Sequence, residues 1–320
     1  MFKPDFVRVP TNGIHLNVAQ AGPADGPLLI FLHGFPEFWC GWRHQIEHFA
    51  NLGYRVWAPD QRGYNLSDKP GAIRDYVLDT LAGDIIGLID AAGCARARVV
   101  GHDWGAAVTW WLALKHRNRI ERAAILNVPH PAVMGRTLTR SLSQLLKSWY
   151  MFFFQVPGLP EAVIRRNRYA AAARSLVASS RPGTFSQADL DRYIEAWSRT
   201  DGLRTMIHWY RAIGQKPSRM GNPRVRVPLL MIWGARDRFL GRALAQPSID
   251  LCDDGRLELI EEAGHFVQHE EPARVNDLIV AFLRNEMFGP TPSNVRACPE
   301  APAPIGSPRQ QSHRFGRSHI

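Results

Sequence analysis

Asp103 stands in the pentapeptide Gly101-His102-Asp103-Trp104-Gly105, which joins a short apolar stretch at 97–100 to a stretch with helical composition at 106–115. The pattern predicts a strand, a sharp turn and a helix, because glycines at 101 and 105 let the helix fold back closely against the strand. A carboxylate at such a turn can attack carbon and form an alkyl ester of the enzyme. An aspartate here could instead cap the helix, but the flanking glycines favour the nucleophile.

Hydrolysis of such an ester needs water, a base that activates the water, and an acidic group that orients the base. Asp237 comes three residues after the stretch 228–234, which has the composition of a buried strand. His265 follows a second predicted strand at 257–260. Because the carboxyl ends of parallel strands meet at one edge of a sheet, we expect Asp237 and His265 to lie beside Asp103.

Neighbouring residues could take the same two roles. His269 is the alternative base, and it lies four residues after His265, a spacing found in some zinc sites. No third ligand is evident, so the sequence predicts neither a metal nor another cofactor. The position of Asp237 after its strand favours it over the alternative acids, which are Asp253, Asp254, Glu261 and Glu262.

A second turn, His33-Gly34-Phe35-Pro36-Glu37, follows the continuously apolar stretch 27–32. A turn at the end of a strand beside the nucleophile can direct a backbone N–H towards the negative charge that develops on an oxygen. We therefore predict that the N–H groups of Phe35 and Trp104 form an oxyanion hole. The sequence leaves open an ordinary turn that only ends the strand, and it does not show whether Pro36 is cis.

The elements that must hold these residues alternate between strands and helices. Alternating apolar residues at 6–9 and 14–19, on either side of Thr11-Asn12-Gly13, predict a β-hairpin. Further predicted strands lie at 27–32, 55–58, 97–100, 123–128, 228–234 and 257–260, and predicted helices at 39–50, 76–92, 106–115 and 272–286. This order predicts an α/β fold in which helices flank a mostly parallel, twisted sheet.

The alternation stops between the strands at 123–128 and 228–234, where only helical patterns occur. We therefore predict a core in two parts, 1–129 and 228–288, with an inserted helical cap at 130–227. The remaining residues, 289–320, contain six prolines and few large apolar residues. This composition predicts a disordered, basic tail.

Positive charge is concentrated in the middle of the chain. The whole chain has a net charge of +10, and residues 131–226 contain 16 Lys or Arg and 5 Asp or Glu, a net +11. Such a segment could attract an anionic ligand, a lipid surface or nucleic acid, but a solvated helical surface is the simpler interpretation. No pattern typical of nucleic-acid binding accompanies it, so no nucleic-acid partner is expected.

Few features bear on location. The first ten residues lack the apolar segment of a signal peptide, and no stretch approaches the ~18 apolar residues that span a membrane. The four cysteines, Cys40, Cys94, Cys252 and Cys298, are widely spaced, which suits a reducing compartment better than a disulfide framework. We expect a cytoplasmic protein without an integral membrane segment, and the sequence leaves homo-oligomerisation open.

Together, the turn His33-Gly34-Phe35-Pro36-Glu37, the elbow Gly101-His102-Asp103-Trp104-Gly105, Asp237 and Gly264-His265 resemble the α/β-hydrolase-fold epoxide hydrolases. The resemblance covers about residues 5–288 and omits the tail. It implies an α/β-hydrolase fold, attack of Asp103 on an epoxide, and hydrolysis of the resulting ester to a diol.

The same family holds the epoxide oxygen with two tyrosines of the cap. The aromatic segment 148–158 resembles the first tyrosine segment and implies Tyr150, and the segment 207–211 resembles the second and implies Tyr210. A phenol of pKa ~10 can donate a proton to a developing alkoxide while it is uncharged at rest. Both tyrosines could instead be core residues, and Tyr169 and Tyr193 are weaker candidates.

Two other functions remain. A haloalkane or haloacid dehalogenase would use the same aspartate, although the tyrosine pair and Phe35 favour the epoxide over a halide. A non-catalytic ligand-binding protein on a hydrolase scaffold is disfavoured, because all five candidate side chains are retained. The apolar residues of the cap indicate a small hydrophobic epoxide, with water as co-substrate. The positive charge of the cap extends this expectation to an epoxide that bears a carboxylate.

Overall fold

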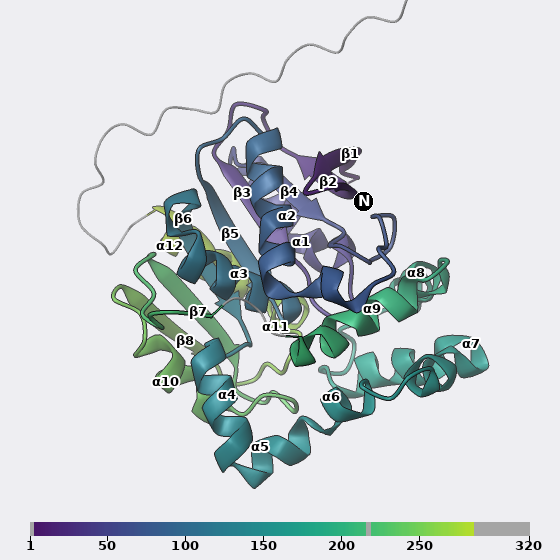
Figure 1. The fold of residues 1–320 in the computed structure, drawn as a ribbon. Coiled ribbons are helices and arrows are strands. Elements are labelled where there is room, and N and C mark those ends of the chain that lie inside the picture. The colour runs from purple at the N-terminus through teal and green to yellow at the C-terminus, as the bar shows by residue number, and fades with distance from the viewer. Residues whose placement is uncertain (1–2, 216–218, 285–320) are drawn as a thin grey trace, which may run out of the picture.

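The computed structural model describes residues 3–215 and 219–284, and an eight-stranded sheet forms their centre (Figure 1). The strand order across the sheet is β1-β2-β4-β3-β5-β6-β7-β8. In chain order the strands are β1 (Asp5–Thr11), β2 (Ile14–Ala21), β3 (Leu28–Leu32), β4 (Arg55–Pro59), β5 (Ala97–His102), β6 (Ile120–Leu126), β7 (Leu229–Gly234) and β8 (Gly255–Ile260).

Pairing within this sheet is mostly parallel. Only β1–β2 and β2–β4 pair antiparallel, and every other neighbouring pair is parallel. The predicted hairpin is present, and its turn places Asn12 and Gly13 at positive φ angles of 43° and 78°, which these two residue types adopt readily. The predicted α/β fold with a mostly parallel sheet is therefore confirmed.

Helices follow most of the strands. The α-helices are α1 (Arg43–Asn51), α2 (Leu78–Ala91), α3 (Trp104–Lys115), α4 (Pro131–Arg140), α5 (Leu142–Lys147), α6 (Trp149–Phe153), α7 (Leu159–Ala178), α8 (Gln187–Ser198), α9 (Gly202–Arg211), α10 (Ala245–Ile249), α11 (Val267–Glu270) and α12 (Pro272–Arg284). Short 3-10 turns lie at Trp39–Trp42, Ile73–Tyr76, Arg117–Arg119, Ala212–Gly214 and Arg242–Leu244.

Both faces of the sheet are covered, which explains why its central strands are continuously apolar. Leu229 and Met231 of β7 belong to the core that includes α2 and α3, whereas Leu230 and Ile232 belong to the core that includes α1 and α12. This alternation with a period of two residues follows from the pleat of a strand.

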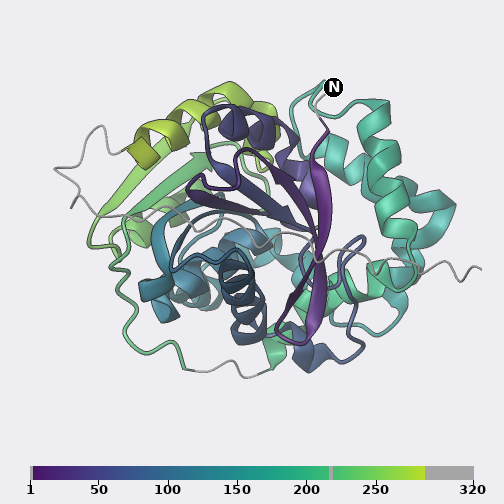
Figure 2. The same cartoon turned by 90° about the horizontal axis from the view of Figure 1, so that it is seen from above.

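The chain between β6 and β7 is helical, as its sequence predicts, and holds α4 to α9. Figure 2 shows most of these helices gathered on one side of the sheet. One isolated β-bridge, between Val225 and Cys252, follows them. The predicted tail, 289–320, lies outside the described residues.

No helix of the described residues is long and apolar enough to cross a membrane. Cys40 and Cys252 are free and buried. Cys94, in contrast, is disulfide-bonded, although the wide spacing of the cysteines indicated no disulfide framework. Spacing along the chain did not reveal the bond, because a disulfide depends on proximity in the fold.

Candidate active site

Asp103 lies in the sharp turn between β5 and α3, with φ 49° and ψ −121°. A Cβ atom at Gly101 would lie 2.3 Å from the carbonyl oxygen of Gly105, and one at Gly105 would lie 2.1 Å from that of Leu32. Glycine is therefore required at both positions, since such contacts are far shorter than van der Waals distance. Asp103 occupies the N-cap position of α3 but makes no side-chain capping bond, so its carboxylate is free for another role.

One oxygen of this carboxylate is held by the turn that follows β3. The backbone N–H of Phe35 donates to Oδ1 of Asp103 at 2.7 Å, and the peptide bond between Phe35 and Pro36 is cis. Gly34 makes the approach possible, because a Cβ atom there would lie 2.3 Å from Cβ of Asp103. Among the described residues, the N–H of Trp104, the second predicted donor, makes no hydrogen bond to Asp103.

His265 lies between the two predicted carboxylates. Its Nδ1 atom donates to Oδ2 of Asp237 at 2.8 Å, and its Nε2 atom lies 3.7 Å from Oδ2 of Asp103. The N–H groups of Phe239 and Leu240 donate to the other oxygen of Asp237, at 2.7 and 3.0 Å. The fold thus brings together three residues that are up to 162 positions apart in the chain.

Asn127 also holds Asp237, and the sequence interpretation missed it. Its Nδ2 atom donates to Oδ2 of Asp237 at 2.8 Å, and its Oδ1 atom accepts from the N–H of Gly234 at 2.9 Å. Asn127 follows β6 directly. The available signal was a polar residue immediately after a buried strand, at the same sheet edge as the elbow.

His265 and Asp103 shift each other's pKa. Burial would lower the pKa of His265, but the charges of Asp237 and Asp103 and the hydrogen bonds to them outweigh burial and raise this pKa to about 10. Burial would raise the pKa of Asp103, but the hydrogen bond and charge of His265 hold it below its ordinary value. Near pH 7, a charged imidazole therefore faces ionised carboxylates.

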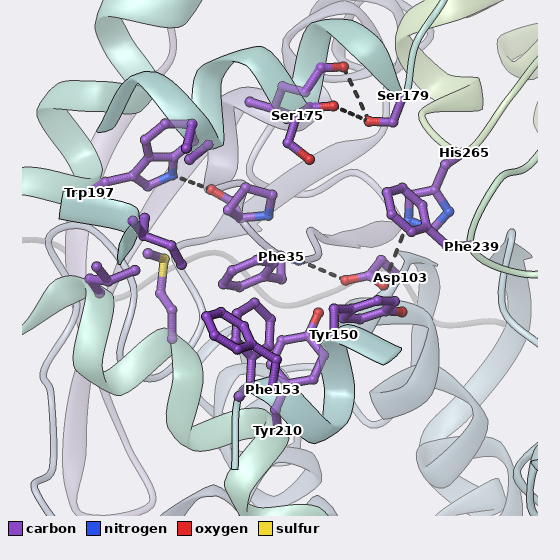
Figure 3. A pocket seen from close by; sticks show the side chains of 18 of the residues that line it. Phe35, Asp103, Tyr150, Phe153, Ser175, Ser179, Trp197, Tyr210, Phe239 and His265 are labelled. Atoms are coloured by element: carbon purple, nitrogen blue, oxygen red, sulfur yellow. Dashed lines mark hydrogen bonds and ion pairs between the residues drawn. The ribbon is translucent and has the colours of Figure 1, made fainter. Parts of the chain in front are cut away.

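Tyr150 and Tyr210 line the same cavity as Asp103 and His265, a space of about 230 Å³. Figure 3 shows both tyrosine rings on one side of Asp103. The two rings meet edge to face, with centroids 5.9 Å apart. Burial, followed by the negative charge of Asp103, raises the pKa of both hydroxyls, so both stay protonated near neutral pH.

The rest of the cavity wall is mostly apolar. Side chains from α6, α7 and α9 close it opposite Asp103, among them Phe153, Ile164, Leu176, Leu203 and Met206. This composition suits a ligand with a hydrophobic body and a small polar group.

The two weaker tyrosine candidates do not line this cavity. The hydroxyl of Tyr193, on α8, donates to Oε1 of Glu37 at 2.8 Å. Tyr169 lies in α7 at a left-handed φ of 64° and packs against Trp197. Neither hydroxyl is therefore placed to contact a ligand beside Asp103.

Glu37 is the centre of a buried polar network behind the elbow, and no role was predicted for it. Its Oε1 atom contacts Nε2 of His269 at 2.7 Å, and its Oε2 atom contacts Nδ1 of His102 at 3.2 Å and accepts from Gln268 at 3.0 Å. The Nε2 atom of His102 in turn contacts the carbonyl oxygen of His265 at 2.9 Å. The network therefore connects α8 and α11 to the elbow.

The same network contains His269, the alternative base. Burial would raise the pKa of Glu37, but the charge of His269 and the hydrogen bonds of His102 and His269 hold it well below its ordinary value. His269 thus faces Glu37 and not Asp103.

Two of the alternative acids form exposed ion pairs, Asp253 with Arg224 and Glu261 with Arg242. No group of three or more metal-ligating side chains occurs within the described ranges.

The chain is similar in sequence and in fold to known proteins. Residues 27–272 match the family model of the alpha/beta hydrolase fold. The AB hydrolase superfamily protein YfhM of Bacillus subtilis is 48% identical, with 87% of this chain and 97% of that protein covered. Epoxide hydrolase 2 of Caenorhabditis elegans is 35% identical, with 88% and 81% covered. The crystal structure of a variant of an epoxide hydrolase from Bacillus megaterium matches with a TM-score of 0.79 at 28% identity, covering 88% of this chain and 100% of that one.

Proposed function

We propose that this chain, which belongs to the α/β-hydrolase fold family and to the epoxide hydrolases within it, converts small hydrophobic epoxides to vicinal diols. The observation that carries the proposal is that an ionised carboxylate, Asp103, and two protonated phenols, Tyr150 and Tyr210, line one apolar cavity. The carboxylate can supply an electron pair to carbon while a phenol supplies a proton to oxygen.

In the first step, Oδ2 of Asp103 attacks one epoxide carbon. A new C–O bond forms, the bond from that carbon to the epoxide oxygen breaks, and its electron pair goes to this oxygen. Tyr150 and Tyr210 hold this oxygen, and one of them donates its proton. The N–H of Phe35 holds Oδ1, which leaves the other oxygen for the attack.

Ester formation changes the electrostatics around His265. Asp103 loses its negative charge, so one of the causes that raise the pKa of His265 disappears. His265 then releases its proton, which replaces the one that the tyrosine donated. The imidazole becomes a base at the stage where a base is needed.

In the second step, neutral His265 takes a proton from water, and the hydroxide attacks the ester carbon of Asp103. The N–H groups of Phe35 and Trp104 stabilise the tetrahedral oxyanion. The C–O bond to the substrate breaks, and His265 donates its proton to the departing oxygen. The second proton of the water, left on the carboxyl group, moves to His265 and restores the ion pair.

We also propose a role for the helical segment and a location for the protein. Residues 130–227 act as the cap over the core parts 1–129 and 228–288, since α6, α7 and α9 line the cavity opposite Asp103. The protein acts in the cytoplasm without a cofactor or nucleic-acid partner. Opening an epoxide removes a reactive electrophile, so the reaction fits a detoxifying role.

Trapping the ester tests the proposal. His265→Gln should form the ester and fail to hydrolyse it, so mass spectrometry should find the Asp103 peptide heavier by the mass of the epoxide. Asp103→Asn should give no such adduct. An unmodified Asp103 peptide in His265→Gln, after incubation with epoxides that the wild-type enzyme converts, would contradict the mechanism.

Dehalogenation is the alternative that shares the nucleophile. A halide leaves as an anion and needs N–H donors, whereas the donors that face Asp103 from the helical segment are phenols, which suit an alkoxide. Halide release from chlorinated and brominated substrates, without turnover of aliphatic, styrene-type or fatty-acid epoxides, would favour that alternative.

A further inference from the structure

The outer side of α5, α6 and the start of α7 exposes large apolar side chains to solvent. Leu142 and Leu146 are 71% and 65% exposed, and Trp149 and Phe152 are 62% and 58% exposed. Each pair is separated by four or three positions, so its members share one side of the helix. With Val156 and Leu159, which are also exposed, these four residues form what we call the apolar rim. A soluble surface rarely concentrates such residues without a partner.

Positive charge flanks the apolar rim on both sides along the chain. Arg136 and Arg140 precede it on α4, and Arg165, Arg166 and Arg168 follow it on α7, all of them exposed. The only acidic residue between 131 and 178 is Glu161. Glu161 is buried and paired with Arg211, so it does not neutralise these arginines.

We propose that the apolar rim docks on an anionic lipid surface, with its apolar side chains among the lipid headgroups and its flanking arginines on the phosphates. Apolar side chains within a basic surround are the combination that holds a protein at an anionic membrane surface without spanning it. A second copy of this chain fits less well, because it would bring two arginine-rich surfaces together.

The apolar rim adjoins the cavity, so docking would affect which substrates reach Asp103. Trp149 is exposed and also lines the cavity, and its neighbours Tyr150 and Phe153 on α6 line it too. Figure 1 shows α5, α6 and α7 following one another along one border of the molecule. A docked enzyme would therefore take epoxides that partition into the bilayer. This substrate class rests on the proposed function, whereas the docking itself does not.

Vesicle binding tests the docking. The full chain should co-sediment with vesicles of phosphatidylcholine that contain about 30% phosphatidylglycerol, and only weakly with phosphatidylcholine alone. Binding should weaken as NaCl rises from about 0.05 to 0.5 M, because salt screens the arginines. Arg165→Gln with Arg166→Gln should lower the affinity for the anionic vesicles about 25-fold, since each of the two cations contributes roughly fivefold.

Variants of the rim separate its apolar part from its charge. Leu146→Ser with Phe152→Ser should lower the affinity at least tenfold, while turnover of a water-soluble epoxide stays unchanged, since neither residue lines the cavity. The matched controls are Leu52→Ser, an exposed leucine at the end of α1, and Arg117→Gln. Both should bind like the wild type.

Some outcomes would overturn the docking. The docking is contradicted if the wild type does not bind the anionic vesicles. It is also contradicted if the variant Leu146→Ser with Phe152→Ser binds them as tightly as the wild type. If the wild type is a dimer that binds no vesicles, and the rim variant is a monomer, the apolar rim is instead an interface between two copies of this chain. Asp103→Asn should bind vesicles normally, so loss of docking and loss of epoxide turnover are read separately.

Discussion

His265 approaches Asp103 on the oxygen that the Phe35 N–H leaves free. Its Nε2 atom lies 3.7 Å from Oδ2 of Asp103, whereas the N–H of Phe35 donates to Oδ1 at 2.7 Å. The two oxygens of the carboxylate therefore have different surroundings, one neutral donor and one cation. In the proposed mechanism this difference selects Oδ2 for attack and leaves Oδ1 as the carbonyl oxygen of the ester.

Removing the charge of Asp103 should lower the pKa of His265. In Asp103→Asn, which mimics the neutral ester, we expect this pKa to fall from about 10 towards the ordinary histidine value of about 6.5. NMR titration of the imidazole measures the change, and Glu261→Gln, at an exposed ion pair, is the control. An equal pKa in Asp103→Asn and the wild type would contradict the electrostatic argument.

The same shift predicts how stability depends on pH. A histidine whose pKa is raised by folding stabilises the protein fully below its unfolded pKa and loses that contribution as pH rises through its folded pKa. Melting temperature should therefore fall between about pH 6.5 and 10, and less steeply in Asp103→Asn than in the wild type. A parallel decline in both proteins would argue against this source of stability.

Removing a phenol hydroxyl should slow ester formation specifically. Tyr150→Phe and Tyr210→Phe should each lower the rate of ester formation about 10- to 100-fold, because a positioned general acid contributes about 100- to 10,000-fold and the remaining phenol still holds the oxygen. The double variant should form no measurable ester. Single-turnover kinetics in the His265→Gln background isolates this step. Tyr169→Phe, which does not line the cavity, should keep the parental rate.

Asn127 is a positioning residue whose loss should affect the second step. In Asn127→Ala, Asp237 and the N–H of Gly234 each lose a hydrogen bond, so we expect ester hydrolysis to slow about tenfold and stability to fall by about 1–3 kcal/mol. Rapid-quench analysis should show more ester at steady state and an unchanged rate of its formation. Asn118→Ala, at an exposed asparagine, supplies the comparison, and a slowed first step would assign Asn127 a different role.

Loss of the Glu37 carboxylate should destabilise the fold strongly. Glu37→Ala leaves the hydroxyl of Tyr193 and the side chains of His269, Gln268 and His102 without their shared buried partner. Breaking a buried charged network in this way costs about 3–5 kcal/mol, measured by urea unfolding. Glu261→Ala, from an exposed pair with Arg242, should cost less than about 1 kcal/mol. Similar losses in both variants would show that the network contributes little.

Local sequence patterns were sufficient to predict the fold class and the turns. The apolar period of each strand and helix, and the glycines of the elbow, depend on contacts within a few residues or within one strand–turn–helix unit. The predicted parallel sheet and the helical segment between β6 and β7 are therefore found in the structure. Asp103, Asp237 and His265 were also expected at one sheet edge, because parallel strands end on the same side.

The partners of those residues required the tertiary structure. Three sets of contacts depend on segments that the fold brings together across the sheet. His265 pairs with Asp237, Asn127 supports Asp237, and Glu37 joins Tyr193 to His269. Of the four tyrosines considered, only Tyr150 and Tyr210 line the cavity, and this follows from how α6 and α9 pack against the core. The sequence alone determined the types of element and indicated the nucleophile that we propose, Asp103. Packing between elements that are distant in the chain decided which buried polar groups meet, because no local pattern records such contacts.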